Sequence, residues 1–175
     1  MIAIECFTAA EAQAHITSQA ILQLYEVTYA AAPYDGQPPY TAGTFRERML
    51  RQAAAPDFTL ALARCTQNTL RGFAVGLHMA PGTWWNGATA APPPILQAGK
   101  YAVLELVVGP EHRDQGIGDQ LLSELLAHRQ ERYATLLTEP KAPAYHYFMR
   151  RGFQPIATAG RATVMVRSLN ASQTV

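Results

Sequence analysis

The sequence predicts one α/β domain built around a mixed β-sheet, and three observations support this fold class. Short apolar stretches typical of strands alternate with helical patterns along 175 residues, a usual length for one domain. Hydrophobic residues make up 49% of the chain, which is enough to fill a core. The most regular stretch, Val103–Arg132, joins a buried strand through a glycine-rich turn to an amphipathic helix.

The first third of the chain is predicted to hold a strand and two helices. Ile2–Phe7 is a short strand, and Thr8 begins a helix that continues to about Tyr29. The apolar face of this helix is expected to carry Ile16, Ala20, Leu24 and Val27. Three prolines and a glycine in the following loop, Tyr29–Tyr40, prevent regular structure. A second helix is expected from Thr41 or Thr44 to about Ala54.

The middle of the chain is predicted to form a hairpin followed by a long insertion. Phe58–Arg64 and Leu70–His78 are strands with a short polar turn between them. Residues 79–94 are rich in proline and glycine and carry both tryptophans of the chain. Long loops in compact domains are usually functional or disordered, and adjacent tryptophans favour an ordered loop. The insertion is therefore a wall of a binding site, a subunit contact or a purely structural loop.

The last third is predicted to form a strand, a helix and an antiparallel pair. Thr135–Thr138 is the strand, and the helix Ala144–Arg151 ends at a glycine. Phe153–Ala157 and Thr163–Arg167 pair around a turn at position 160. The last six residues, 170–175, are expected to be a frayed tail.

The central stretch has the local chemistry of an anion site. The strand Val103–Val108 contains a single charge, Glu105, and a Gly-Pro pair ends it. Gln115–Gly118 supplies two glycines where the next helix begins, so a phosphate can approach the unpaired N–H groups of the helix. This helix has an apolar face of Ile117, Leu121, Leu122, Leu125 and Leu126. No Lys-Ser/Thr follows the glycines and a third glycine is missing, so neither a Walker loop nor a dinucleotide fingerprint is matched.

Composition excludes several other classes of function. The net charge is +1, and no basic stripe is present, so nucleic-acid binding has no support. The N-terminus does not resemble a signal peptide and no window is long enough to span a membrane, so a cytoplasmic protein without membrane contacts is expected. Cys6 and Cys65 have neither disulfide nor metal-site spacing, and we expect small buried side chains and no metal.

Several motifs together resemble those of the GCN5-related N-acetyltransferase (GNAT) family. Arg113–Gly118 resembles its Arg/Gln-x-x-Gly-x-Gly/Ala motif, Leu106–Glu111 its splayed strand and Pro-Glu turn, and Ala144–Phe153 its late helix ending in Gly-Phe. These motifs cover about half of the chain. The resemblance implies one GNAT domain over residues 1–175, with a twisted mixed sheet of about seven strands and helices on both faces. It also implies that the sheet opens between the strands Leu104–Val108 and Thr135–Thr138.

The resemblance implies transfer of an acetyl group from acetyl-CoA to an amine without a covalent enzyme intermediate. Backbone N–H groups of the glycine turn are expected to hold the pyrophosphate, and the strand end to pair with the pantetheine arm. The expected acetyl-CoA contacts are Leu106, Val107, Val108, Arg113, Asp114, Gln115, Gly116, Ile117, Gly118 and Asp119. Asp119 departs from the family, which commonly has Arg or Lys there; it either weakens donor binding or binds the helix N-terminus.

Glu105 and Tyr147 are the expected catalytic residues. A buried carboxylate has a raised pKa unless it is paired, which suits a general base near neutral pH. The alternatives for Glu105 are an anchor for the ammonium of the substrate and a structural partner of an arginine. The family usually has Tyr at the position of Phe148, which has no proton to donate. Tyr147, Tyr145, His146 or water must then protonate the thiolate. Lys141 also replaces the Asn common at the start of this helix, so CoA contacts there are in doubt.

The acceptor is expected to be the primary amine of a small, partly apolar molecule, because few acidic residues accompany the aromatic loops. The expected substrate contacts are Tyr29, Tyr34, Tyr40, Trp84 and Trp85, although the three tyrosines are equally explained by packing onto the sheet. Three alternatives remain: a catalytically weak acyl-CoA-binding or regulatory module, a protein or peptide acetyltransferase, and a nucleotide-binding protein. A homodimer is compatible with the sequence.

Overall fold

The computed structural model describes residues 1–169, so the predicted tail at 170–175 lies outside the described residues. The strands within this range are β1 (Ile2–Thr8), β2 (Thr59–Cys65), β3 (Leu70–Met79), β4 (Lys100–Val108), β5 (Tyr133–Thr138), β6 (Gln154–Ala159) and β7 (Ala162–Ser168). The helices are α1 (Ala9–Ile16), α2 (Gln19–Tyr29), α3 (Ala42–Gln52), α4 (Pro93–Leu96), the 3-10 turn η1 (Pro110–His112), α5 (Ile117–Leu126) and α6 (Pro143–Arg150). Among these described helices, none is long and apolar enough to cross a membrane.

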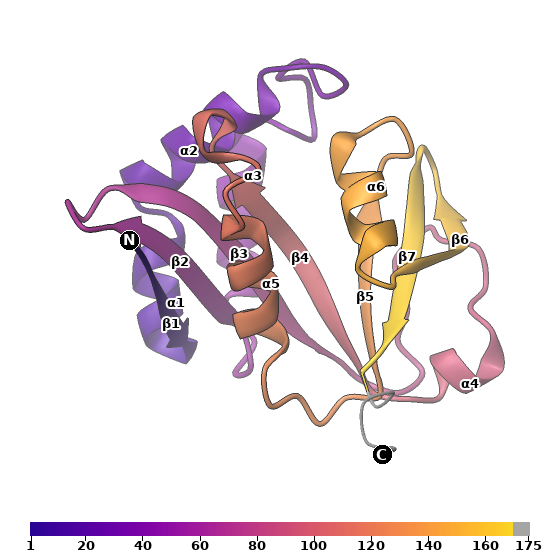
Figure 1. The fold of residues 1–175 in the computed structure, drawn as a ribbon. Helices are drawn as coiled ribbons and strands as arrows, with labels where there is room; N and C mark the ends of the chain where they lie inside the picture. Colours follow the sequence, from indigo (N-terminus) through magenta and orange to yellow (C-terminus); the bar gives the residue numbers. More distant parts are fainter. Residues whose placement is uncertain (170–175) are drawn as a thin grey trace. The chain divides into compact units, whose positions relative to one another are not determined.

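The strands form the mixed sheet that the sequence predicts. Hydrogen-bonded neighbours follow the order β1-β2-β3-β4-β5-β7-β6, with the strands coloured along the chain in Figure 1. The pair β4–β5 is parallel, whereas β1–β2, β2–β3, β5–β7 and β6–β7 are antiparallel. The β4–β5 register runs from Lys100↔Tyr133 to Val103↔Leu136 and ends there, although β4 continues to Val108. The pairing thus stops where the predicted opening of the sheet begins.

The described part of the chain divides into two compact units, each made of two segments that alternate along the sequence. The first unit comprises Met1–Leu77 and Glu105–Ala127, and the second comprises His78–Leu104 together with residues 128–169. β4 contributes to both, since Lys100–Leu104 belongs to the second unit and the rest of the strand to the first. A single domain over 1–175 stays a prediction, and each unit is described by itself.

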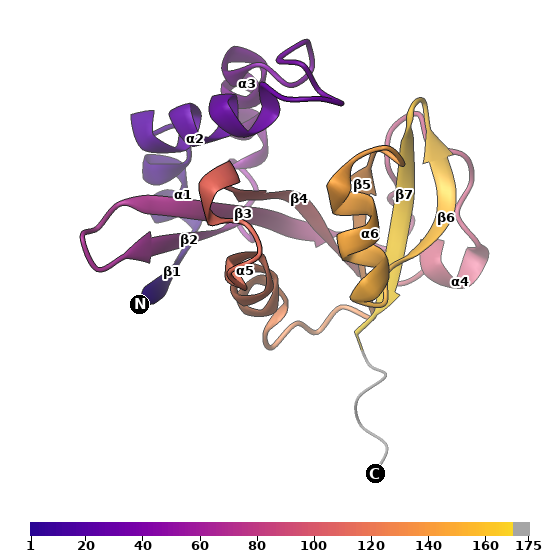
Figure 2. The same ribbon diagram turned by 45° about the horizontal axis from the view of Figure 1, so that its top comes forward.

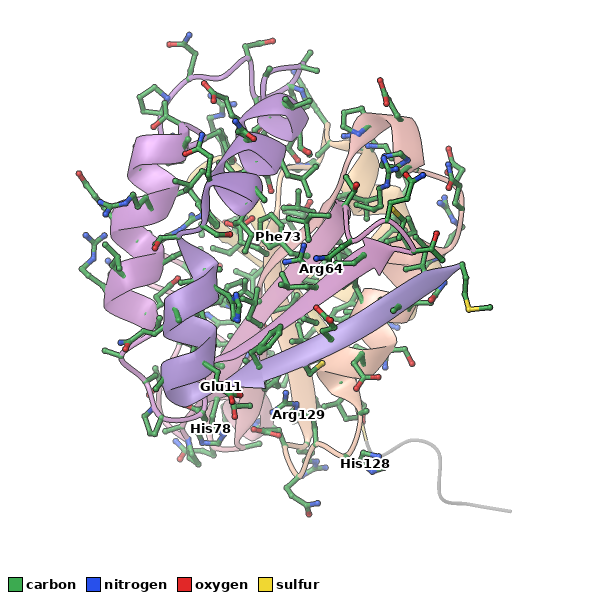
Figure 3. All side chains as sticks on the ribbon, turned by 90° about the vertical axis from the view of Figure 1, so that its left-hand side faces the viewer. Glu11, Arg64, Phe73, His78, His128 and Arg129 are labelled. Atoms are coloured by element: carbon green, nitrogen blue, oxygen red, sulfur yellow. The ribbon has the colours of Figure 1, made fainter. Side chains whose placement is uncertain are left out.

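In the first unit, helices cover both faces of the strands. Figure 2 shows α1, α2 and α3 on one side of β1–β3 and α5 on the other. Phe73 of β3 lies on the side of α1–α3, and its ring is 5.8 Å from that of Phe45 on α3 (Figure 3). On the opposite side, a Cβ at Gly72 would lie 2.8 Å from the Val107 carbonyl oxygen and 3.0 Å from a Leu121 methyl. Glycine at this position therefore allows β4 and α5 to approach β3 closely.

The second unit packs α6 against the antiparallel strands β5, β7 and β6. Phe148 of α6 is 6% exposed, and its ring packs edge-on against Phe153 at 5.5 Å. Lys100, at the start of β4, is completely buried. Its ammonium donates to the carbonyls of Ile95, Leu96 and Ala98 at 3.2, 3.2 and 2.8 Å, at the C-terminal end of α4. This lysine thus holds the short helix α4 onto the strand.

The first predicted helix differs from the structure. The chain forms two helices, and Thr17 and Ser18 between them leave the helical conformation. Hydroxyl side chains compete for backbone hydrogen bonds, so Thr-Ser favours a helix boundary over a helix interior. The apolar face of α2 consequently buries Ile21 and Tyr25, and Val27 is 59% exposed. Thr8 is the N-cap as predicted, but its side chain makes no capping hydrogen bond to the described residues.

Candidate active site

Glu105 is a buried carboxylate with two polar partners in the first unit. Its side chain is 6% exposed, and the only other charged residue of β4 is Lys100 at the start of the strand. Arg48 Nη2 of α3 donates to Oε1 in an ion pair, and the Tyr29 hydroxyl donates to Oε2 at 3.1 Å. Glu105 therefore has the arginine partner that was one of the alternatives for this residue. Arg48 itself was missed by the sequence analysis, since nothing in a helical pattern marks one of several arginines as the partner of a distant strand.

Helix α3 positions Arg48 toward Glu105. Thr41 caps the helix by accepting a hydrogen bond from the Thr44 N–H at 3.1 Å, which fixes where the helix begins. Phe45 and Met49 are completely buried on its inner face, and Arg48 lies beside them with 32% of its side chain exposed. Its Nε–H is buried and has no acceptor among residues 1–169. The guanidinium thus keeps donor capacity beyond its bond to Glu105.

The predicted tyrosines gather around the hydrogen bond from Tyr29 to Glu105. The Tyr29 ring stacks on Tyr40 at 5.3 Å and meets Tyr34 edge-on at 4.7 Å. On its other flank it lies 4.4 Å from the ring of Tyr25, which is completely buried. The cis peptide bonds Ala32-Pro33 and Pro38-Pro39 are part of the loop that carries Tyr34 and Tyr40. The structure packs Tyr29, Tyr34 and Tyr40 against one another, and their role as substrate contacts stays a prediction.

Burial controls the ionisation of this cluster. It raises the pKa of Glu105, although the Arg48 charge and the Tyr29 hydrogen bond act in the opposite direction. Burial and the charge of Glu105 raise the pKa values of Tyr25 and Tyr29, so both stay neutral. Burial alone would lower the pKa of Arg48, but Glu105 and the two tyrosines raise it overall. At neutral pH the arginine is charged, and the carboxyl group takes up a proton more readily than an exposed glutamate does.

The predicted phosphate turn has a backbone suited to an anion. Asp114 and Gly116 have positive φ angles of 60° and 76°, and Gly116 is the N-cap of α5. In the described part of the chain, no side chain makes a capping hydrogen bond to this helix end. A Cβ at Gly116 would meet nothing within 4 Å, so the turn is open. An uncapped N-terminus with an open glycine is what a pyrophosphate group requires.

Arg71 of β3 fixes the turn that follows β4. The Gly109 N–H donates to the Arg71 carbonyl at 2.9 Å, and the Arg71 guanidinium contacts the His112 ring. Arg71 also donates to the sulfur of Cys65 at 3.8 Å. The pKa of Cys65 is lowered to about 7, chiefly by backbone hydrogen bonds from Gln67 and Thr69 and to a smaller extent by Arg71. Contrary to expectation, Cys65 is half-buried and Cys6 is exposed, because both occupy ends or edges of strands.

Tyr147 and Phe148 occupy different environments in the second unit. Phe148 points into the core, so the residue at the usual tyrosine position is a packing residue. Tyr147 is partly exposed, and the Arg151 guanidinium lies 3.5 Å from the centre of its ring. Arg151 also donates to the Tyr147 carbonyl at 3.1 Å. The role of Tyr147 as the acid stays a prediction.

The tryptophan loop is anchored within the second unit. Trp85 Nε1 donates to the buried hydroxyl of Thr135 at 2.9 Å, and Trp84 Nε1 donates to the Thr89 carbonyl at 3.0 Å. The Thr89 N–H in turn donates to the Thr158 carbonyl at 2.8 Å. These bonds explain why a loop rich in proline and glycine is ordered. A substrate role for Trp84 and Trp85 stays a prediction. Across residues 1–169, no group of three or more His, Cys, Asp or Glu side chains has the arrangement of a metal site.

Comparisons with known proteins show what the sequence and the fold are similar to. A model of the acetyltransferase (GNAT) domain matches residues 72–155, which include the phosphate turn and Glu105. The PaiA N-acetyltransferase from Thermoplasma acidophilum, solved in complex with coenzyme A, is similar with a TM-score of 0.66 and 17% identity; the match covers 95% of this chain and 99% of that one. A comparison with curated protein sequences gives no match.

Two further solved structures share the fold at low identity. An acetyltransferase from Thermus thermophilus has a TM-score of 0.65 and 14% identity, over 95% of this chain and 97% of that one. The ribosomal-protein-S18-alanine N-acetyltransferase from Escherichia coli has a TM-score of 0.59 and 14% identity, over 100% and 99% of the two chains. At these identities the similarity concerns the fold, and the acceptors of these proteins do not transfer to this chain.

Proposed function

Because the chain belongs to the GNAT acetyltransferase family, which uses acetyl-CoA, we propose that it acetylates the primary amine of a small molecule by direct attack on the thioester. The observation that carries this proposal is Glu105, a buried carboxylate with a raised pKa in the part of β4 beyond its pairing with β5. It directly precedes the strand segment proposed to bind the donor. Such a group can accept the proton that an ammonium must lose before it becomes a nucleophile.

The donor is proposed to bind at the open end of β4 and the N-terminus of α5. Acetyl-CoA would supply the activated acyl group there. Its pyrophosphate is expected at the backbone of Arg113, Asp114, Gln115, Gly116, Ile117, Gly118 and Asp119, because the helix end is uncapped and its dipole favours an anion. Its pantetheine arm is expected along Leu106, Val107 and Val108, where β4 runs beyond its pairing with β5.

The chain then needs to move two protons. Glu105 is proposed to accept one from the acceptor ammonium, directly or through water, so that the nitrogen can form its bond to the acyl carbon. As the carbon–sulfur bond breaks, the leaving thiolate takes up a proton. Tyr147 is the candidate donor, with water as the alternative, since Phe148 is buried and has no acidic proton.

A second candidate is an acyl-CoA-binding module with weak or no catalysis. The ion pair between Arg48 and Glu105 favours it, because a carboxylate held by arginine is a poorer base than a free one. The two candidates share the donor site and differ in turnover. Donor binding without turnover of any amine in a broad panel supports the module, and robust turnover of one amine removes it.

The donor site is tested by thermal shift with CoA esters. ATP and NAD are tested in the same way, because a nucleotide-binding protein would be stabilised by them instead. CoA is expected to raise the melting temperature, and ATP and NAD to leave it unchanged. Gly116→Ala is expected to weaken CoA binding, because it forces a side chain into a left-handed backbone at the turn. Gly160→Ala is the matched control, since Gly160 also has a positive φ and open space but lies in the β6–β7 turn. Equal loss of CoA binding in both variants would contradict the proposed site.

Turnover is tested by release of free thiol from acetyl-CoA in the presence of pooled amines, amino acids and short peptides. Small-molecule amines are expected to be acetylated, and peptides are included because one similar structure is of a protein acetyltransferase. Tyr147→Phe should lower turnover without changing CoA binding if the phenol is the acid. Unchanged turnover assigns this step to water or another group.

A further inference from the structure

Arg48 has properties beyond those of a counter-ion for Glu105. A buried ion pair is most favourable when both partners are fully satisfied. Here Glu105 is almost fully buried, whereas a third of the Arg48 side chain is exposed, 32% against 6%. One guanidinium nitrogen, Nη2, bonds Glu105, and the buried Nε–H has no acceptor among the described residues. The arginine therefore retains both access to solvent and unused donors.

A second polar group lies beside Arg48. Tyr25 is completely buried, and its hydroxyl interacts with the Arg48 guanidinium. It lies close enough to Arg48 and Glu105 to interact with both charges. Native proteins seldom bury polar atoms without partners unless water, an ion or a ligand completes the network. The buried Nε–H of Arg48, which has no acceptor among residues 1–169, marks the place where a ligand atom belongs.

The charges of the cluster narrow the kind of ligand. Arg48 and Glu105 form a neutral pair, and the surrounding tyrosines add neutral hydroxyls and ring faces. A polycation such as a polyamine finds one carboxylate, already bonded, and an arginine that repels it. A zwitterion instead presents an anion to Arg48 and a cation to Glu105, so that four charges alternate in sign. The tyrosine rings can contact an apolar part of such a molecule.

From these contacts we infer that Arg48 is an anion subsite for the acceptor, whose substrate class is a primary amine that also carries a carboxylate, such as an α-amino acid. The inference rests on the proposed function and deepens it. The acceptor carboxylate binds the guanidinium, and the ammonium takes the place of Arg48 beside Glu105. The same exchange loosens the Arg48–Glu105 bond and leaves Glu105 with an oxygen facing the amine. An amine without a carboxylate lacks the anion that drives this exchange.

The test compares matched acceptors that differ only at the carboxylate. For several side chains, the amino acid, its amide and the decarboxylated amine are compared by kcat/KM for thiol release. Loss of a charged hydrogen bond reduces binding about tenfold to a hundredfold, and we expect the amide and the amine to be poorer acceptors by that factor. Binding is measured separately as the rise in melting temperature on adding each compound to the CoA complex.

Variants of α3 assign the preference to Arg48. Arg48→Gln is expected to reduce the ratio of kcat/KM for the amino acid to kcat/KM for its amide about tenfold to a hundredfold, so that the preference disappears. The ratio is used because Arg48 also bonds Glu105, and a change in the base applies to both acceptors. Arg48→Lys keeps the positive charge and serves if Arg48→Gln does not fold; it should lose part of the preference. Arg51→Gln is the matched control, because Arg51 is an exposed arginine one turn-length further along the same helix.

The outcomes separate the two proposals. Equal acetylation of the three acceptors by the wild type, or an equal loss for all of them in Arg48→Gln, overturns the anion subsite and leaves the acetyltransferase intact. If no amine is acetylated, the proposed function fails. The rise in melting temperature on adding each compound to the CoA complex then shows whether the anion subsite exists. Stabilisation by the amino acid but not by its amide, abolished in Arg48→Gln, supports the subsite; equal or no stabilisation overturns it.

Discussion

Two buried charges on the same strand, Lys100 and Glu105, are neutralised in different ways. Both are almost inaccessible, at 0% and 7% exposure, in a strand that is otherwise apolar apart from the Tyr101 hydroxyl. Lys100 belongs to the second unit and Glu105 to the first. An unpaired buried charge is costly, so each must be compensated. The means of compensation indicates what each residue can do.

Lys100 is compensated by the backbone. Its ammonium uses its three donors on three carbonyls around the end of α4, and burial lowers its pKa. A backbone carbonyl cannot move away without unfolding the helix end. The arrangement is therefore closed, and its role is to hold the α4 segment onto β4.

Glu105 is compensated by side chains that can move. Its partners are the partly exposed Arg48 and the Tyr29 hydroxyl, on two helices of the first unit. A flexible arginine with an unused donor can be drawn to another anion, whereas a carbonyl cannot. The comparison teaches that a buried charge is structural when the backbone satisfies it and is a functional candidate when its partner is exchangeable.

The largest expected effect is the loss of turnover when Glu105, the proposed functional charge, is replaced. Glu105→Gln removes the proposed base and should lower kcat about 10²- to 10⁴-fold, the usual contribution of general-base catalysis. CoA binding should remain, because the phosphate turn is untouched. The measurement is thiol release under saturating acceptor, with thermal shift as the check on CoA. Wild-type kcat in the variant would exclude Glu105 as the base.

The next largest effect is the loss of stability when Lys100, the proposed structural charge, is replaced. Lys100→Met keeps the buried stem but leaves three carbonyls without their donor, so the free energy of unfolding should fall by about 2–4 kcal/mol. Turnover per folded molecule should change little. Chemical unfolding measures the change, and Lys141→Met is the control because Lys141 is exposed. A large loss of kcat with intact stability would reverse the assignment of Lys100.

The pH dependence of turnover and of stability also distinguishes Glu105 from Lys100. The base must be ionised, so turnover should fall as pH decreases through the raised pKa of Glu105. Stability depends on pH in the opposite direction. A raised folded-state pKa means that the fold favours the protonated carboxyl, so this contribution is full below the unfolded pKa and is lost as pH rises through the folded one. Glu105→Gln should lose both slopes and Lys100→Met should keep them. Identical pH curves for wild type and Glu105→Gln would contradict the prediction.

The smallest expected effect concerns the second partner of Glu105. Tyr29→Phe removes one hydrogen bond to the carboxylate and should lower the free energy of unfolding by about 1–2 kcal/mol. Since that bond favours the ionised carboxyl, its loss should move the acidic limb of the turnover profile to higher pH. The profile of kcat against pH measures this shift, and Tyr40→Phe is a control for the tyrosine cluster. A shift to lower pH would show that Tyr29 does not stabilise the carboxylate.

The local signals in the sequence were sufficient for most of the fold. Glycine, proline and the 3.6-residue or two-residue spacing of apolar residues act over a few neighbours, and they located the strands around the hairpin, the phosphate turn and helix α5. The break at Thr17–Ser18 and the short helix α4 were missed. In the first case two adjacent apolar patterns merged into one. In the second, a run of prolines hides a four-residue helix, whose end is held by Lys100 at the start of the next strand.

The sequence by itself determined the motifs shared with the GNAT family, the glycine turn before α5 and the presence of an acidic residue in a buried strand. Only the tertiary structure decided what that residue meets. Arg48 is separated from Glu105 by more than fifty positions, and a helical pattern that places Arg48 beside a buried face does not specify which strand lies opposite. Ion pairs of this kind depend on how helices pack on a sheet. For that reason the sequence predicts Glu105 as a candidate base, and only the fold shows the arginine that is its partner.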